Sequence, residues 1–104
     1  MSKRQKKDNV KLIDKQKQKV EPPRKFKVVF YNDDFTPMEF VVQILQQIFH
    51  HPAESAYTIM LNVHNKGRGV AGVYSKEIAE TKAHMVNEAA RNYGHPLQAE
   101  FEPE

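Results

Sequence analysis

The stretch YNDDFTPMEF at residues 31–40 decides the fold, because it links an apolar segment typical of a strand to one typical of a helix. Its Asn32, Asp33 and Asp34 favour a turn, since their short side chains bond the local backbone and tolerate unusual dihedral angles. Two hypotheses fit this turn. It is either an ordinary strand-to-helix connection or a binding site for a cationic group.

The start of the first helix follows this turn directly. Residues 36–39 match a capping box, in which the Thr36 hydroxyl accepts a hydrogen bond from a free helix N–H and Glu39 reaches back. Pro37 suits the first position of a helix. We therefore expect a helix that begins at Pro37 and ends near His50.

Apolar periodicity predicts three strands and three helices in all. The strands are expected at residues 26–31, 69–74 and 97–101, and the helices at residues 37–50, 52–67 and 76–93. Gly67 should end the second helix in a left-handed conformation, and Ser75 should cap the third. Gly69 and Gly72 favour a bulge in the second strand or the close approach of another segment. The helix positions expected to face the core are Met38, Val41, Val42, Leu45, Ile48 and Phe49 in the first, Ala56, Ile59, Met60 and Val63 in the second, and Ala79, Ala83, Val86, Ala90 and Tyr93 in the third.

The resulting order, β-α-α-β-α-β, predicts a small α+β domain over residues 23–104. We expect a three-stranded antiparallel sheet with three helices packed on one face. Residues 1–22 should form a disordered basic N-terminal extension, because they hold too few large apolar side chains to repay the entropy of ordering.

The balance of basic and acidic residues changes near the same boundary. Residues 1–25 carry ten Lys/Arg against three Asp/Glu, whereas residues 26–104 carry six against ten. The basic character therefore belongs to the extension, and no basic nucleic-acid-binding face is indicated on the domain. The chain has no cysteine, no secretory signal and no apolar run near the roughly 18 residues of a membrane span, so we expect a cytoplasmic protein without a membrane partner.

The residues offer little for catalysis. There is no cysteine nucleophile and no glycine-flanked serine. His50, His51 and His64 do not follow a zinc-ligand spacing, although they leave metal-dependent hydrolysis as an open alternative. We expect no enzyme activity, no metal and no cofactor.

A binding function fits the residues around the turn better than catalysis does. Two adjacent carboxylates would repel the anion that a helix N-terminus attracts, so an ammonium group is the better electrostatic match. Met38 and Val41 place an apolar patch beside these acceptors. Met60, Val63 and His64 would face the same spot if the first two helices pack as a hairpin. The arrangement suits a ligand with an ammonium group beside a hydrophobic side chain, and ordinary core packing is the alternative.

The turn also carries a family resemblance. Residues 32–41, NDDFTPMEFV, closely resemble the signature of the ClpS adaptors. The other matching segments are Met60-Leu61-x-Val63-His64, Gly67 to Tyr74, Ala79-Glu80-Thr81-Lys82 and His95-Pro96-Leu97. The resemblance covers residues 22–101 in the same order. It implies a monomeric, non-enzymatic adaptor that recognises N-degron substrates and passes them to a ClpA-type AAA+ unfoldase for degradation by ClpP.

The resemblance implies the site residues as well. The positions that hold the free α-amino group match Asn32, Asp33, Asp34 and His64. The pocket for a first side chain of Leu, Phe, Tyr or Trp matches Thr36, Met38, Val41, Met60, Val63 and Leu97. Met38 matches the position that excludes β-branched side chains. Glu77 and Lys82 match positions that dock the adaptor on the N-terminal domain of the unfoldase, which engages the flexible extension during transfer.

A different class of function remains possible. The basic extension could make this protein a nucleic-acid-associated or ribosomal structural module. That hypothesis predicts RNA or DNA binding that falls steeply with salt and disappears when residues 1–21 are deleted.

Overall fold

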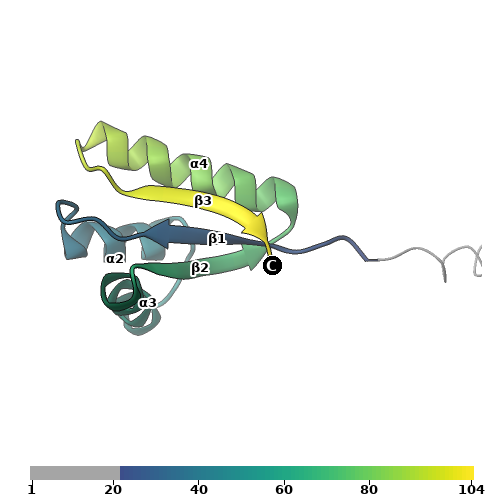
Figure 1. Ribbon diagram of the computed structural model, residues 1–104, viewed down its shortest axis with the longest axis horizontal. Coiled ribbons are helices and arrows are strands. Elements are labelled where there is room, and N and C mark those ends of the chain that lie inside the picture. Colours follow the sequence, from purple (N-terminus) through teal and green to yellow (C-terminus); the bar gives the residue numbers. More distant parts are fainter. Residues whose placement is uncertain (1–21) are drawn as a thin grey trace, which may run out of the picture.

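A computed structural model describes residues 22–104 (Figure 1). Its elements are β1 (Phe26–Tyr31), α2 (Met38–Gln47), α3 (Ala53–Lys66), β2 (Arg68–Tyr74), α4 (Lys76–Asn92) and β3 (Gln98–Pro103). The predicted order of elements and the α+β class are confirmed. The extension predicted at residues 1–22 lies outside the described residues, apart from Pro22.

The sheet is antiparallel, as predicted, with the strand order β2-β1-β3. The central strand β1 is the most apolar one, and its Val28 and Val29 are fully buried. Val28 pairs with Gly72 and Val29 pairs with Val70, so Ala71 is an extra residue on β2. This bulge is the irregularity that the two glycines of the strand predicted.

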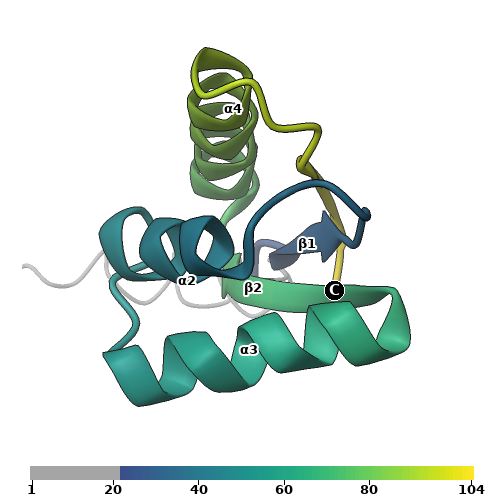
Figure 2. The ribbon, with the colours of Figure 1, turned by 90° about the vertical axis from the view of Figure 1, so that its left-hand side faces the viewer.

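All three helices lie on one face of the sheet (Figures 1 and 2). The small side chains of α4 let it lie closely along β3 and β1. Asn87 on α4 holds β3 with its side-chain amide, which donates to the Ala99 carbonyl (3.0 Å) and accepts from the Ala99 N–H (2.8 Å). The other two helices pack on each other, and α3 also covers β2. Tyr93, predicted to be buried, is 71% exposed because it lies beyond the end of α4.

The burial of α2 differs from the single stripe that its sequence predicts. Phe40 and Ile44 are buried in addition to most of the predicted positions, whereas Met38 is 44% exposed and Val42 is only half-buried. The ring of Phe40 contacts that of His95, with 4.7 Å between the centroids. The helix therefore packs against the α4–β3 connection as well as against α3, which buries a second side of it.

The end of α2 is also earlier than predicted. The chain leaves the helix before His50, which has a left-handed φ of 60°. Lys82 of α4 donates to the Ile48 carbonyl (2.7 Å) at this helix end. The Lys82 ammonium group also lies over the rings of Phe49 and Tyr74, 5.6 and 5.3 Å from their centroids. Lys82 thus stabilises the C-terminus of α2, where a positive charge is favourable.

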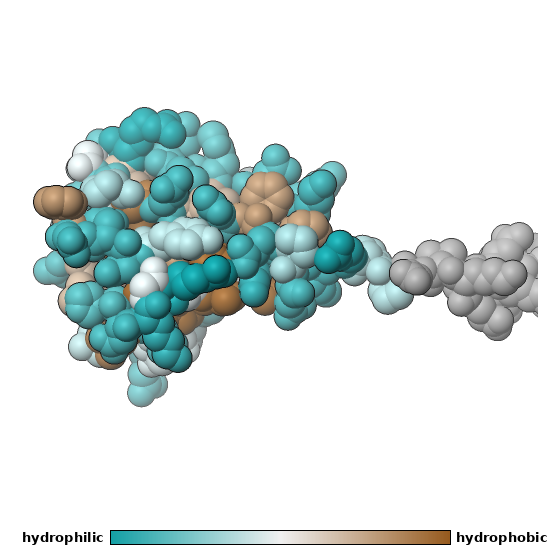
Figure 3. Space-filling model, in the orientation of Figure 1, coloured by the Kyte–Doolittle hydropathy of each residue, from teal (hydrophilic) through white to brown (hydrophobic). Residues whose placement is uncertain are grey.

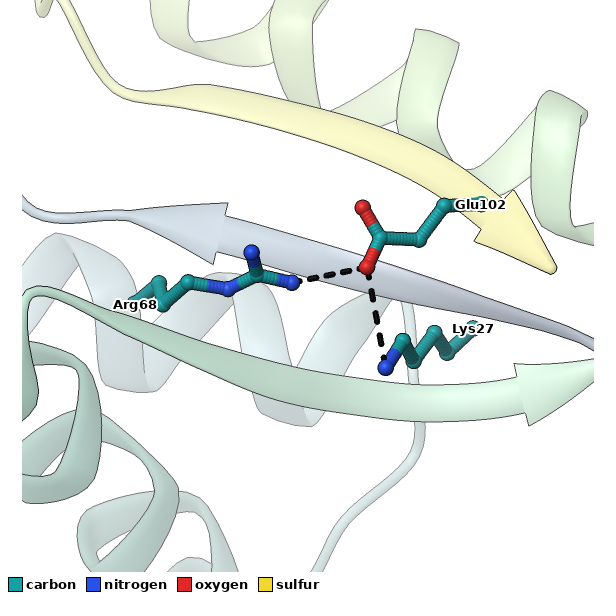
Figure 4. Close-up of polar contacts among 3 residues, drawn as sticks. All are labelled: Lys27, Arg68 and Glu102. Carbon is teal, nitrogen blue, oxygen red and sulfur yellow. Dashed lines mark hydrogen bonds and ion pairs between the residues drawn. The ribbon is translucent and has the colours of Figure 1, made fainter. Parts of the chain in front are cut away.

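The other face of the sheet carries mainly polar side chains (Figure 3). Glu102 accepts a hydrogen bond from Arg68 (2.7 Å) and lies 3.6 Å from the Lys27 ammonium group (Figure 4). The hydrogen bond from Arg68 holds the pKa of Glu102 below its usual value. Within residues 22–104, no helix has both the length and the apolar composition that crossing a bilayer requires.

Candidate functional site

Asp33 holds the turn between β1 and α2. Its Oδ1 accepts from the N–H groups of Phe35 (2.8 Å) and Thr36 (2.7 Å), and its Oδ2 accepts from the Thr36 hydroxyl (2.8 Å). The predicted capping box is therefore wrong, because the Thr36 hydroxyl donates to Asp33 and no side chain of residues 22–104 caps α2. The physical reason is that Pro37, and not Thr36, occupies the capping position.

These hydrogen bonds set the charge of Asp33. Burial opposes its ionisation, but the hydrogen bonds from Thr36 and Phe35, together with the nearby His95, outweigh that effect. They hold the pKa of Asp33 below its ordinary value of 3.8. Asp33 is therefore a carboxylate at neutral pH, and most of its hydrogen-bonding capacity is used within the turn.

The neighbouring polar side chains are differently placed. Asn32, Asp34 and His64 are exposed, and none of their side chains makes a hydrogen bond or ion pair with another residue of the described range 22–104. The backbone N–H of Asn32 donates to the carbonyl of Gly67 (2.9 Å), which ties the turn to the end of α3. Gly67 ends α3 with a φ of 89°, as predicted. The tie brings the last turn of α3, which carries His64, to the β1–α2 turn.

A pocket of about 180 Å³ opens where these segments meet. Figure 2 views this end of the molecule, where the β1–α2 turn, the C-terminal end of α3 and the α4–β3 connection converge. The pocket is lined by Tyr31, Asn32, Asp33, Asp34, Thr36, Met38, Val41, Met60, Val63, His64 and Leu97. The structure thus brings together all ten residues that were assigned to the amine site and the side-chain pocket. Tyr31 was missed, although its place directly before Asn32 was an available signal.

The floor and the mouth of the pocket differ in burial. Val41, Met60, Val63 and Leu97 are buried and belong to the core, whereas Met38 is exposed at the mouth. The shape near Val63 depends on a glycine of β2. A Cβ atom at Gly69 would lie 2.8 Å from the Val63 side chain, so only glycine lets β2 lie this close to α3.

The pocket combines a polar side and an apolar side. One side has the acceptors of Asn32, Asp34 and His64 and the charge of Asp33, and the other side is apolar. A cavity of roughly 150 Å³ is known to accept a benzene ring, so this pocket has room for one large hydrophobic side chain. Among the residues that the structure describes, no three His, Asp or Glu side chains are grouped to hold a metal ion. Fold and pocket together define a small α+β domain with a pocket at a strand-to-helix turn.

Glu77 and Lys82, the residues assigned to docking, do not line this pocket. Glu77 is exposed in the first turn of α4, and Lys82 is half-buried at the end of α2.

Comparison with known proteins identifies the family and agrees with the fold. Residues 21–100 match the family model described as ATP-dependent Clp protease adaptor protein ClpS. The ATP-dependent Clp protease adapter protein ClpS of Leptothrix cholodnii is 57% identical over 91 residues, which cover 88% of this chain and 79% of that protein. Its counterpart in Paraburkholderia phymatum is 55% identical over 97 residues, which cover 93% and 92%.

A solved structure is similar as well. It is that of Agrobacterium tumefaciens ClpS2 bound to L-phenylalaninamide, with 36% sequence identity and a TM-score of 0.78. The similarity covers 80% of this chain and 100% of that one. The chain belongs to the ClpS family of ATP-dependent Clp protease adaptors.

Proposed function

We propose that this adaptor binds proteins through their free α-amino group and a large hydrophobic first side chain, and delivers them to a ClpA-type unfoldase for degradation by ClpP. The observation that carries this proposal is the pocket, in which three polar side chains without a side-chain partner in residues 22–104 lie beside an apolar floor. The ligand of the related ClpS2, L-phenylalaninamide, joins a free amine to a benzyl side chain and supports the same chemistry.

In this proposal the polar residues of the pocket bind the α-amino group in two ways, by hydrogen bonds and by charge. Asn32, Asp34 and His64 accept hydrogen bonds from the ammonium group, because their side chains are free of partners within residues 22–104. Asp33 contributes its negative charge and keeps the turn in shape. The first side chain, from Leu, Phe, Tyr or Trp, enters between Val41 and the other buried residues of the floor.

The energies are sufficient for transient recognition. Burying one Leu or Phe side chain supplies about 1.5–3 kcal/mol, and each hydrogen bond to a charged group supplies about 1.5–3 kcal/mol. Two or three such bonds and the buried side chain contribute about 4.5–12 kcal/mol before the cost of ordering the peptide, so micromolar affinity, roughly −8 kcal/mol, requires interactions near the upper end of this range.

Acetylation of the peptide tests the amine site. A fluorescently labelled Phe-initiated peptide should lose at least about 100-fold in affinity when acetylated, since two or more charged hydrogen bonds are removed. A Ser-initiated peptide serves as the control that keeps the amine and lacks the hydrophobic side chain. Binding should also weaken above pH ~8, where the α-amino group loses its proton. Equal affinity of the free and acetylated peptides would refute the proposal.

Met38 is proposed to select the first side chain. It stands at the mouth, where its side chain would crowd a residue branched at Cβ. Met38→Ala should therefore admit Ile- and Val-initiated peptides. Met85→Ala, which changes a methionine of similar exposure (45%) on α4, is the matched control. An unchanged preference in Met38→Ala would contradict this assignment.

Delivery is proposed to use Glu77 and Lys82 for docking. Glu77→Ala is the cleaner test, because Lys82 also binds the Ile48 carbonyl and its removal would disturb α2. Glu77→Ala should weaken binding to the N-terminal domain of the unfoldase and leave peptide affinity unchanged, with the exposed Glu80→Ala as the control. In this proposal the adaptor acts in the cytoplasm as a monomer, and the unfoldase engages the extension, residues 1–22, during transfer.

A further inference from the structure

A second hollow of about 460 Å³ lies beside the pocket, between α2 and α3. We call it the α2–α3 groove. It is lined by Met38, Glu39, Val42, Gln43, Gln46, Tyr57 and Met60. Met38 and Met60 line both the pocket and the groove, so the two hollows adjoin at these side chains.

The groove lies along the part of α2 that core packing leaves uncovered. Met38, Val42 and Gln46 are spaced at i, i+4 and i+8, and therefore form one ridge along α2. Tyr57 and Met60, at i and i+3, face this ridge from α3, which lies beside α2 (Figure 2). Met38 is 44% exposed, Tyr57 is 55% exposed and Val42 is half-buried. Core packing thus leaves this apolar surface uncovered.

The spacing of an extended peptide relates the groove to the pocket. Side chains of an extended chain alternate between two faces, so the first and third point to the same side, roughly 6.6–6.8 Å apart. Successive residues on a helix ridge have Cβ atoms about 5–6 Å apart. If the peptide runs along the α2 ridge after its first side chain has passed Met38 into the pocket, the third side chain reaches the surface near Val42.

We propose that the α2–α3 groove binds the third side chain of the peptide and prefers an apolar one. This inference rests on the proposed function of the pocket. The two methionines make the lining adaptable, so the groove should accept Leu, Met and Phe without strict selection of shape. Its polar rim is formed by Glu39, Gln43 and Gln46.

The test compares two Leu-initiated peptides that differ only at the third residue, which is Leu or Ser. Fluorescence anisotropy should show roughly three- to tenfold tighter binding for Leu, as expected from partial burial of one side chain. Tyr57→Ser should reduce this preference to below twofold. Tyr93→Ser, which changes an exposed tyrosine outside the groove, should keep it. Gln46→Asp, at an exposed rim position, is a second variant and should also reduce the preference.

The outcomes separate the two proposals. The acetylated and free forms of the peptide with Ser at position three report on the pocket alone. If only the free form binds and Leu at position three adds nothing, the groove inference is overturned and the pocket stands. A preference that persists in both Tyr57→Ser and Gln46→Asp also overturns the groove inference. If acetylation makes no difference, the proposed function fails and the groove inference fails with it.

Discussion

The connection from β2 to α4 consists of one residue, Ser75, whereas the connection from β1 to α2 runs over residues 32–37. The Ser75 hydroxyl accepts from the N–H of Ile78 (3.4 Å), and the helix begins at the next residue. In the longer connection, Asp33 alone accepts three hydrogen bonds within the turn. Its neighbours Asn32 and Asp34 have no such partners within residues 22–104.

The difference shows that folding does not require the extra acceptors. A single capping side chain is enough to start a helix after a strand, as Ser75 shows. In the β1–α2 turn, the structural task belongs to Asp33, so the adjacent Asn32 and Asp34 are available to a ligand. We therefore propose that stability depends on Asp33 and ligand binding on its neighbours Asn32 and Asp34, so substitutions should separate the two effects.

The largest effect is expected for Asp33→Ala. It removes three hydrogen bonds of the turn, so the free energy of unfolding should fall by about 2–3 kcal/mol, and peptide affinity should fall with it. Urea denaturation and peptide titration measure the two quantities. Asp33→Asn, which retains one side-chain oxygen as an acceptor, should recover part of the stability. Unchanged unfolding in Asp33→Ala would show that the turn does not depend on this carboxylate.

The next effect concerns binding alone. Asp34→Ala should weaken a Phe-initiated peptide by about tenfold or more, since one charged hydrogen bond of about 1.5–3 kcal/mol is lost. The free energy of unfolding should change by less than about 0.5 kcal/mol, as is usual for an exposed position. Asn32→Ala should behave in the same way. If either variant lost as much stability as Asp33→Ala, the division of tasks within the turn would be wrong.

Ser75→Ala should give the converse result. Loss of this cap should lower the free energy of unfolding by about 0.5–1 kcal/mol. Peptide affinity should stay the same, because Ser75 does not line the pocket. Weaker peptide binding in this variant at temperatures where it is folded would contradict the separation of the two connections.

The smallest effect is a dependence of stability on pH. The pKa of Asp33 is lower in the folded protein than its ordinary value of 3.8, so its charged form stabilises the fold. This contribution is present above about pH 4 and is lost as the pH falls through the folded pKa. Unfolding measured between pH 5 and 2.5 should show a steeper loss for the wild type than for Asp33→Asn. Parallel curves would show that Asp33 is not the group responsible.

Local features of the structure were predictable to different degrees. The strand β1 and the left-handed Gly67 follow from β propensity and helix-ending chemistry, which act over a few residues. The role of Asp33 was not predictable in this way. Three consecutive Asx residues have similar turn propensity, and only the geometry shows which side chain faces the N–H groups of Phe35 and Thr36.

The burial of α2 shows a second limit. Apolar periodicity identified the helix, yet it placed Met38 in the core and missed Phe40 and Ile44. Periodicity reports the apolar side of a helix and does not report how many neighbours the helix has. The uncovered part of its apolar surface is what lines the α2–α3 groove.

The sequence by itself determined the elements, their order and the surplus of acceptors at one turn, because these depend on residues close together in the chain. The resemblance to the ClpS adaptors supplied distant residues such as Leu97, which no local pattern connects to the turn. Only the tertiary structure decided that Leu97, Met60 and Asn32 share one pocket. The physical reason is that a pocket is formed by packing between segments far apart in the chain, and local hydrogen bonding and periodicity do not encode how those segments meet.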